Sequence, residues 1–125
     1  MNTPWLWVGS VLGGLGVMLG AFGAHGLRAR VSPERLANWH TATEYHLIHA
    51  LALLAVGLLL RQAPQTGAAA SAAGWCFTLG TLVFSGSLYL LVLSGQRWLG
   101  AITPIGGVLL IIGWACLSWA ALKTG

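Results

Sequence analysis

The sequence predicts an all-α integral membrane protein, built as a bundle of four transmembrane helices. Apolar residues make up 57% of its 125 residues and charged residues only 6%, whereas a soluble domain carries about 25% charged residues. The mean hydropathy of +0.80 agrees with this. Four apolar stretches of about 20 residues each match the length that a helix needs to cross a bilayer core of about 30 Å. We therefore expect a single membrane domain over residues 1–125.

The first apolar stretch, residues 5–24, contains no charged residue and is expected to form the first spanning helix. Its glycines recur every three or four residues, so they share one side of the helix, where a neighbouring backbone can approach closely. They are Gly9, Gly13, Gly16, Gly20 and Gly23. No basic residue precedes the stretch, so we do not expect a cleaved signal peptide.

The second helix is predicted over residues 33–60. Ser32, Pro33 and Glu34 follow the usual order of an N-cap, a proline in the first turn and an acidic residue near the positive end of the helix. Such a helix is about 42 Å long, more than the bilayer core. Its first part, including Trp39, is therefore expected at the interface, and its membrane part from about residue 45.

Residues 61–73 contain Pro64 and a run of small residues, and are predicted to form a loop. The third helix is expected over residues 74–93, with small and hydroxyl residues at a spacing that favours packing against another helix. The fourth is expected over residues 104–122, because Thr103 and Pro104 resemble a helix start.

Aromatic and basic residues predict the orientation. Tryptophans are expected in belts at the two interfaces, with Trp114 deeper than either belt; the belts are Trp5, Trp7, Trp75 and Trp119 on one side and Trp39 and Trp98 on the other. Four arginines lie in the loops at 25–44 and 94–98, against Arg61 and Lys123 on the opposite side. Since basic residues favour the cytoplasm, these loops are predicted to be cytoplasmic and both termini outside.

Four motifs, in this order and spread over most of the chain, resemble the YgdD family of small membrane proteins, which is also catalogued as a domain of unknown function. The motifs are Gly20–Leu27 (GAFGAHGL), Tyr45 with His49–Leu54 (HALALL), Phe84–Tyr89 (FSGSLY) and Thr103–Gly107 (TPIGG). The resemblance implies a four-helix protein of the bacterial inner membrane. It implies no activity.

One polar cluster is a candidate for chemistry, at the end that carries the 25–44 loop. Polar residues at membrane depth face a bundle interior or an aqueous cavity. The candidate ligand-binding residues are His25, Tyr45, His49, Ser85, Tyr89 and Thr103, and the candidate metal ligands are His25, His46 and His49.

Three interpretations of this cluster stay open at the level of sequence. The histidines can form hydrogen bonds between helices, they can bind a metal, a haem or a small ligand in a His25/His49 pocket, or the protein can be a small transporter with Glu44 as its only candidate carboxylate. No nucleophile motif is present, so we do not expect an enzyme. No cofactor is firmly implied.

The expected function is therefore that of a small, non-enzymatic membrane protein in a packing, accessory or scaffold role. Its partners are the lipid bilayer and either a second copy or a larger membrane protein. The net charge of +4 is spread over short loops and does not form the basic patch of a nucleic-acid-binding protein.

Overall fold

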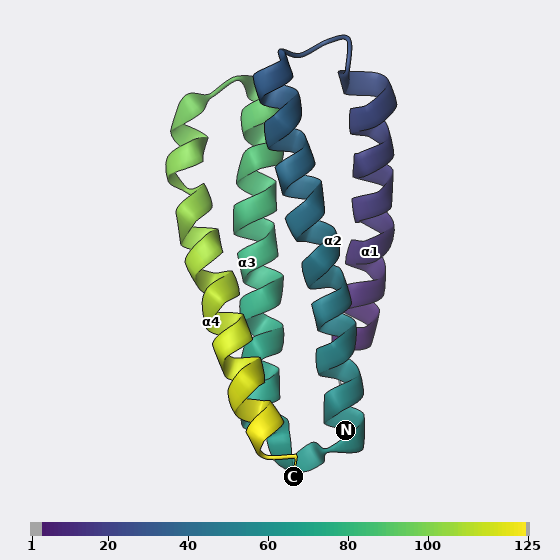
Figure 1. Ribbon diagram of the computed structural model, residues 1–125, viewed down its shortest axis with the longest axis vertical. Coiled ribbons are helices and arrows are strands. Elements are labelled where there is room, and N and C mark those ends of the chain that lie inside the picture. The colour runs from purple at the N-terminus through teal and green to yellow at the C-terminus, as the bar shows by residue number, and fades with distance from the viewer. Residues whose placement is uncertain (1–3, 125) are drawn as a thin grey trace.

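The computed structural model describes residues 4–124 of the chain. Four long α-helices follow one another: α1 (Trp5–Phe22), α2 (Pro33–Gln62), α3 (Gly67–Ser94) and α4 (Thr103–Leu122). Short helical turns continue α1 over Gly23–Leu27 and precede α4 over Arg97–Ala101. Within the described residues, four helical spans are long and apolar enough to cross a membrane (Figure 1), which confirms the predicted fold class.

The helices stand side by side in the order of the chain, and α1 begins at the same end of the molecule at which α4 finishes (Figure 1). The extensive contacts join α1 to α2, α2 to α3 and α3 to α4. In consequence the two middle helices are the most buried, and α1 and α4 expose most of their apolar surface. Such exposure is expected for a protein whose solvent is lipid.

The predicted start of α2 is confirmed in detail. The Ser32 side chain accepts a hydrogen bond of 3.2 Å from the backbone N–H of Arg35, and Pro33 occupies the first turn. The beginning of a helix leaves backbone N–H groups without a partner. Ser32 accepts from one of them, and Pro33 has no N–H group that needs a partner.

The predicted loop over residues 61–73 is wrong. A short turn at Pro64–Thr66 is followed directly by α3, which begins at Gly67. The run of small residues that suggested a loop is rich in alanine, the residue with the strongest preference for a helix. α3 is therefore longer than predicted, and its added residues lie at the end of the molecule at which α1 begins.

Two tryptophans predicted for the interfacial belts have their rings packed against other helices of the protein. Trp39 is 1% exposed, and its indole Nε1 donates to the Leu19 carbonyl of α1 at 2.8 Å. Trp5 is 4% exposed and meets Trp75 edge to face, with ring centroids 5.3 Å apart. Each of the two has a neighbouring helix close enough to cover its ring, which hydropathy alone does not reveal.

Three of the five glycines predicted to form a seam meet α2 closely. A Cβ added at Gly9 would lie 2.9 Å from the Ala50 carbonyl oxygen, and one at Gly16 would lie 2.6 Å from a methyl group of Leu47. Gly23 makes a similarly close approach to Trp39. The seam is therefore used within the monomer, to bring α1 against α2.

Candidate functional site

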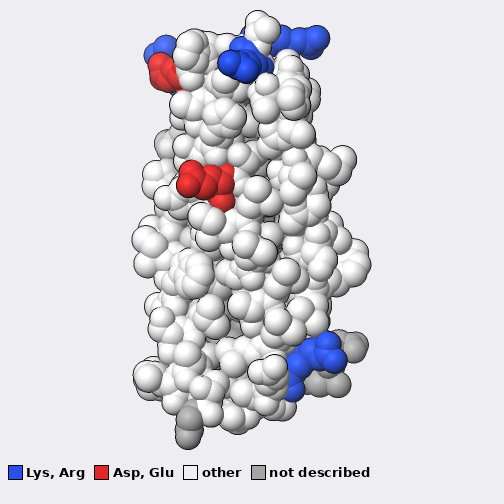
Figure 2. Space-filling model, turned by 45° about the vertical axis from the view of Figure 1, so that its right-hand side comes forward, with Lys and Arg blue, Asp and Glu red and all other residues white. Residues whose placement is uncertain are grey.

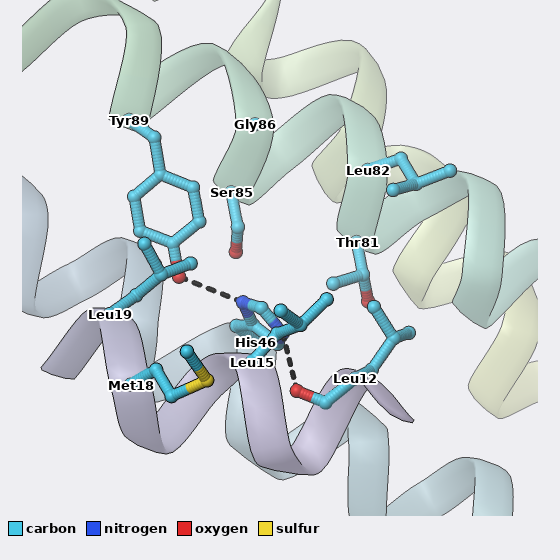
Figure 3. A pocket seen from close by; sticks show the side chains of 10 residues that line it. All are labelled: Leu12, Leu15, Met18, Leu19, His46, Thr81, Leu82, Ser85, Gly86 and Tyr89. Carbon is cyan, nitrogen blue, oxygen red and sulfur yellow. Dashed lines mark hydrogen bonds between the residues drawn. The ribbon is translucent and has the colours of Figure 1, made fainter. Parts of the chain in front are cut away.

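The centre of the polar cluster is His46, a buried residue of α2 that connects three helices. Its Nε2 lies 2.7 Å from the Leu12 carbonyl oxygen of α1, and its Nδ1 lies 2.8 Å from the Tyr89 hydroxyl of α3 (Figure 3). A carbonyl can only accept, so Nε2 carries the proton and Nδ1 accepts from Tyr89. Both nitrogens of a neutral imidazole are thus engaged in holding the helices together.

His49 forms a second connection, one turn further along α2. Its Nδ1 donates to the Tyr45 carbonyl at 2.7 Å, and its Nε2 accepts a 3.0 Å hydrogen bond from the indole N–H of Trp114 on α4. Its proton therefore sits on the other ring nitrogen from that of His46. Phe77 lies against both the His49 and Trp114 rings, with centroids 5.5 and 5.0 Å away.

The hydroxyl residues of the predicted cluster also connect helices. Ser85 of α3 donates to the Ala42 carbonyl of α2 at 2.7 Å. Ser87 of α3 and Thr103 of α4 share a hydrogen bond of 2.6 Å. Tyr45 is half-exposed and packs its ring on Phe84 of α3, with centroids 4.6 Å apart. Such bonds between helices contribute about 0.6–2 kcal/mol each in membrane bundles.

His25 stands apart from the other predicted residues. It lies exposed in the turn that continues α1, near the level at which Gly23 meets Trp39. His49 is ten residues beyond Trp39, about 15 Å along α2. The structure therefore does not bring His25 and His49 into one pocket, and within residues 4–124 no group of three His, Cys, Asp or Glu side chains could hold a metal ion.

A groove of about 290 Å³ opens beside His46, between α1 and α3 (Figure 3). Its walls are mostly aliphatic side chains, among them Leu15 and Met18 of α1 and Leu82 of α3. Thr81 also lines it and is 3% exposed, and its hydroxyl is the one buried side-chain polar atom of the described residues without a hydrogen-bond partner. The groove is therefore an apolar surface, suited to lipid chains.

Sequence reasoning missed two members of this network. Trp114 was recognised as too deep for an interfacial belt, and a tryptophan buried at that depth needs an acceptor for its N–H; that need was the available signal for the bond to His49. The Leu12 carbonyl gave no signal, because every helical residue presents a similar carbonyl.

Charged residues mark the two ends of the molecule, with one exception. Figure 2 shows basic atoms at both ends and acidic atoms both at one end and on the flank, where uncharged atoms surround them. Glu34 belongs to the first turn of α2. Glu44 is exposed and lies ten residues further along the helix, about 15 Å from Glu34.

The distance from the end of α3 gives the depth of Glu44 in the membrane. Since Ser85 bonds to the Ala42 carbonyl, these two residues lie at one level. From Ser85, α3 continues to Ser94, about 13 Å further, and Leu90 and Leu93 in that stretch are more than half exposed. Glu44 follows Ala42 by two residues. When a hydrocarbon core of about 30 Å is centred on α3, Glu44 lies on the order of 10 Å inside it, deeper than a membrane part beginning near residue 45 predicts.

The fold and its polar network define a small multi-pass membrane protein whose polar side chains connect its helices. Residues 19–107 match the family model described as "Protein of unknown function (DUF423)". A UPF0382 membrane protein of Staphylococcus epidermidis is 48% identical over 117 residues, which cover 90% of this chain and 93% of the relative. The UPF0382 membrane protein YwdK of Bacillus subtilis is 44% identical over 116 residues, covering 93% and 94%.

The chain therefore belongs to the DUF423 family of UPF0382 membrane proteins. No solved structure matches it. The membership confirms the expected family of membrane proteins of unknown function.

Proposed function

We propose that this protein is a non-enzymatic membrane scaffold that works as an assembly of at least two copies, joined through the outer face of α2. One observation carries the proposal: Glu44 is exposed near the level of Ser85, which is hydrocarbon depth for a core centred on α3. The engagement of His46 and His49 in bonds between helices supports the non-enzymatic part, because neither imidazole is free to act on a substrate.

A carboxylate on a lipid-facing surface is costly. Insertion measurements give about 2.5–3.5 kcal/mol for a charged residue near the middle of a spanning helix, and such residues almost always face a protein interior or pair with one another. Neither holds for Glu44 in the single chain, since it is exposed. A covering surface would remove this cost if it supplied a hydrogen-bond donor.

The outer face of α2 also carries a side chain that can donate a hydrogen bond to Glu44. His40 lies one turn before Glu44 on the same exposed face, and the face continues toward the other end of the molecule through apolar residues; these are Ile48, Leu51, Ala55 and Leu58. A two-fold interface is self-complementary, so a residue i that meets j on the partner is matched by j meeting i. His40 of each copy can then donate to Glu44 of the other, above an apolar contact.

The experiment that tests the proposal compares Glu44→Leu with the matched control Glu34→Leu. Cys76 and Cys116 are first replaced by alanine, and Ile48→Cys then reports proximity by disulfide crosslinking in membranes. We expect crosslinked dimers in the parent, at least tenfold fewer with Glu44→Leu, and an unchanged yield with Glu34→Leu. A monomeric parent, an undiminished yield with Glu44→Leu, or crosslinks to a different protein would overturn it.

Three finer assignments belong with this proposal. We assign the chain to the YgdD type within its family, on the motifs at Gly20–Leu27 and Thr103–Gly107. We place it in the bacterial plasma membrane. We orient the 25–44 and 94–98 loops to the cytoplasm and both termini outside, because four arginines lie at the first end and two basic residues at the other.

A further inference from the structure

The end of the molecule that carries most of the arginines contains a polar cavity. It has a volume of about 300 Å³ and lies where the first turns of α2 meet the end of α3 and the turn that precedes α4. Its lining is Ser32, Glu34, Arg35, Asn38, Leu91, Gly95 and Arg97. From these residues we infer a binding site for the phosphodiester headgroup of a membrane phospholipid.

Two arginines line the cavity from different elements. Arg35 belongs to the first turn of α2, and Arg97 begins the turn before α4. Neither forms an ion pair with a carboxylate among the described residues. Guanidinium groups bind phosphate through paired N–H donors in a fixed geometry, so two of them in one cavity favour a phosphate oxygen cluster as the occupant.

The glycine at position 95 leaves room for the Arg35 side chain. Gly95 ends α3 in the left-handed conformation, with φ of +75°, and the Arg35 guanidinium lies directly over the site that a Cβ would fill. Glycine therefore serves two purposes here, since it adopts the positive φ without strain and leaves room for the guanidinium. The arrangement holds one cation against the carboxyl end of α3, which favours positive charge.

The charge of the cavity selects the kind of phosphate. Arg35 and Arg97 contribute two positive charges and Glu34 one negative charge, so a single negative charge makes the cavity neutral. A phosphodiester carries one negative charge, whereas a free or monoester phosphate carries about 1.5 to 2 at pH 7. Asn38 and Ser32 add uncharged polar groups for the rest of a headgroup.

The position of the cavity favours a lipid over a soluble phosphate. It lies at the charged end of a spanning bundle, where headgroups are found. Leu91 lines it, and Leu90 and Leu93 on the same stretch of α3 are exposed. Acyl chains can therefore run along α3 below a phosphate held by the two arginines.

The test measures phosphatidylglycerol bound to the detergent-purified full-length protein by native mass spectrometry. The variant is Arg35→Gln with Arg97→Gln, and the matched control is Arg28→Gln with Arg30→Gln, which removes the same charge from the same end outside the cavity. We expect at least fivefold less bound lipid in the variant and less than twofold change in the control. Arg97→Gln alone, which leaves Arg35 on Gly95, should give an intermediate loss.

Two further measurements distinguish a lipid phosphate from a free phosphate and from binding through acyl chains alone. Diacylglycerol, which lacks the phosphate, should not bind at the same concentration. Inorganic phosphate at 10-fold excess over lipid should displace little of it. Equal loss in variant and control, no loss in the variant, binding of diacylglycerol, or full displacement by inorganic phosphate would each overturn the inference. None of these readouts depends on whether the protein is dimeric.

Discussion

The side chain of Tyr89 has one polar atom, its hydroxyl oxygen, and the hydrogen bond of this atom determines the role of the residue. Its hydroxyl donates to His46 Nδ1 at 2.8 Å, while the other side of the imidazole is fixed on the Leu12 carbonyl. The tyrosine therefore connects α3, through one histidine, to both α2 and α1. Removing its hydroxyl leaves a buried imidazole nitrogen without a donor.

We predict that Tyr89→Phe lowers the free energy of unfolding by about 0.6–2 kcal/mol, the value of one hydrogen bond between membrane helices. The measurement is the midpoint of unfolding in mixed detergent, followed by helicity. Tyr45→Phe is the matched control, because the structure gives the Tyr45 hydroxyl no partner among residues 4–124. Equal losses from the two substitutions would contradict the assigned role of Tyr89.

The hydrogen-bond partners of single residues are the part of the structure that the sequence predicts least. Residue type and depth identified Tyr89, Ser85, His49 and Thr103 as polar groups inside a membrane, and all four form hydrogen bonds between or along helices. Their partners include backbone carbonyls, which carry no sequence signature. The pairing of His49 with Trp114 depends on how two helices distant in the chain rotate against each other, and periodicity within one helix does not fix that rotation.

Helix positions were more predictable, because they follow from hydropathy and from start signals such as Ser32 and Pro33. The error at the beginning of α3 has a local cause, the alanine-rich run after Gly67. The glycine seam of α1 was also visible in the sequence, but not the helix that it faces.

At this scale we predict that Gly9→Ala destabilises the protein by about 1–3 kcal/mol, the usual cost of overpacking. The added Cβ would meet the Ala50 carbonyl oxygen at 2.9 Å and Leu53 Cβ at 3.1 Å, and neither can move without shifting α2. Gly20→Ala on the same helix meets nothing within 4 Å and should be neutral or slightly stabilising. A cost for Gly20→Ala equal to that for Gly9→Ala would show that α1 packs differently. Thermal unfolding of both variants provides the comparison.

At the scale of the whole molecule, the helices contact mainly their neighbours in the chain. The two halves on either side of Ala63 are each a helical hairpin, and the main contact between them is that of α2 with α3. Trp5 of α1 also meets Trp75 of α3, and His49 of α2 meets Trp114 of α4. Among the described residues, three side-chain hydrogen bonds join the long helices of one half to those of the other, from Ser85, Tyr89 and Trp114.

We therefore predict that residues 1–63 and 64–125, expressed together as two chains, associate in the membrane and purify together through a tag on one of them. Ser85→Ala should lower the recovered partner, because it removes the bond to Ala42. Ser94→Ala is the control, because its hydroxyl donates to the Leu90 carbonyl and accepts from the Gln96 N–H, both in the second half. Failure of the unmodified halves to purify together would contradict this organisation.

The close glycines of α1 have a geometric consequence. Gly9, Gly16 and Gly23 are seven residues apart, and they meet α2 near Leu53, His46 and Trp39, which are also seven apart. A seven-residue contact repeat makes two helices wind around each other in a left-handed supercoil. One residue inserted into the middle of α1 would therefore rotate everything beyond it by about 100°, and turn the rest of the seam from α2 toward lipid.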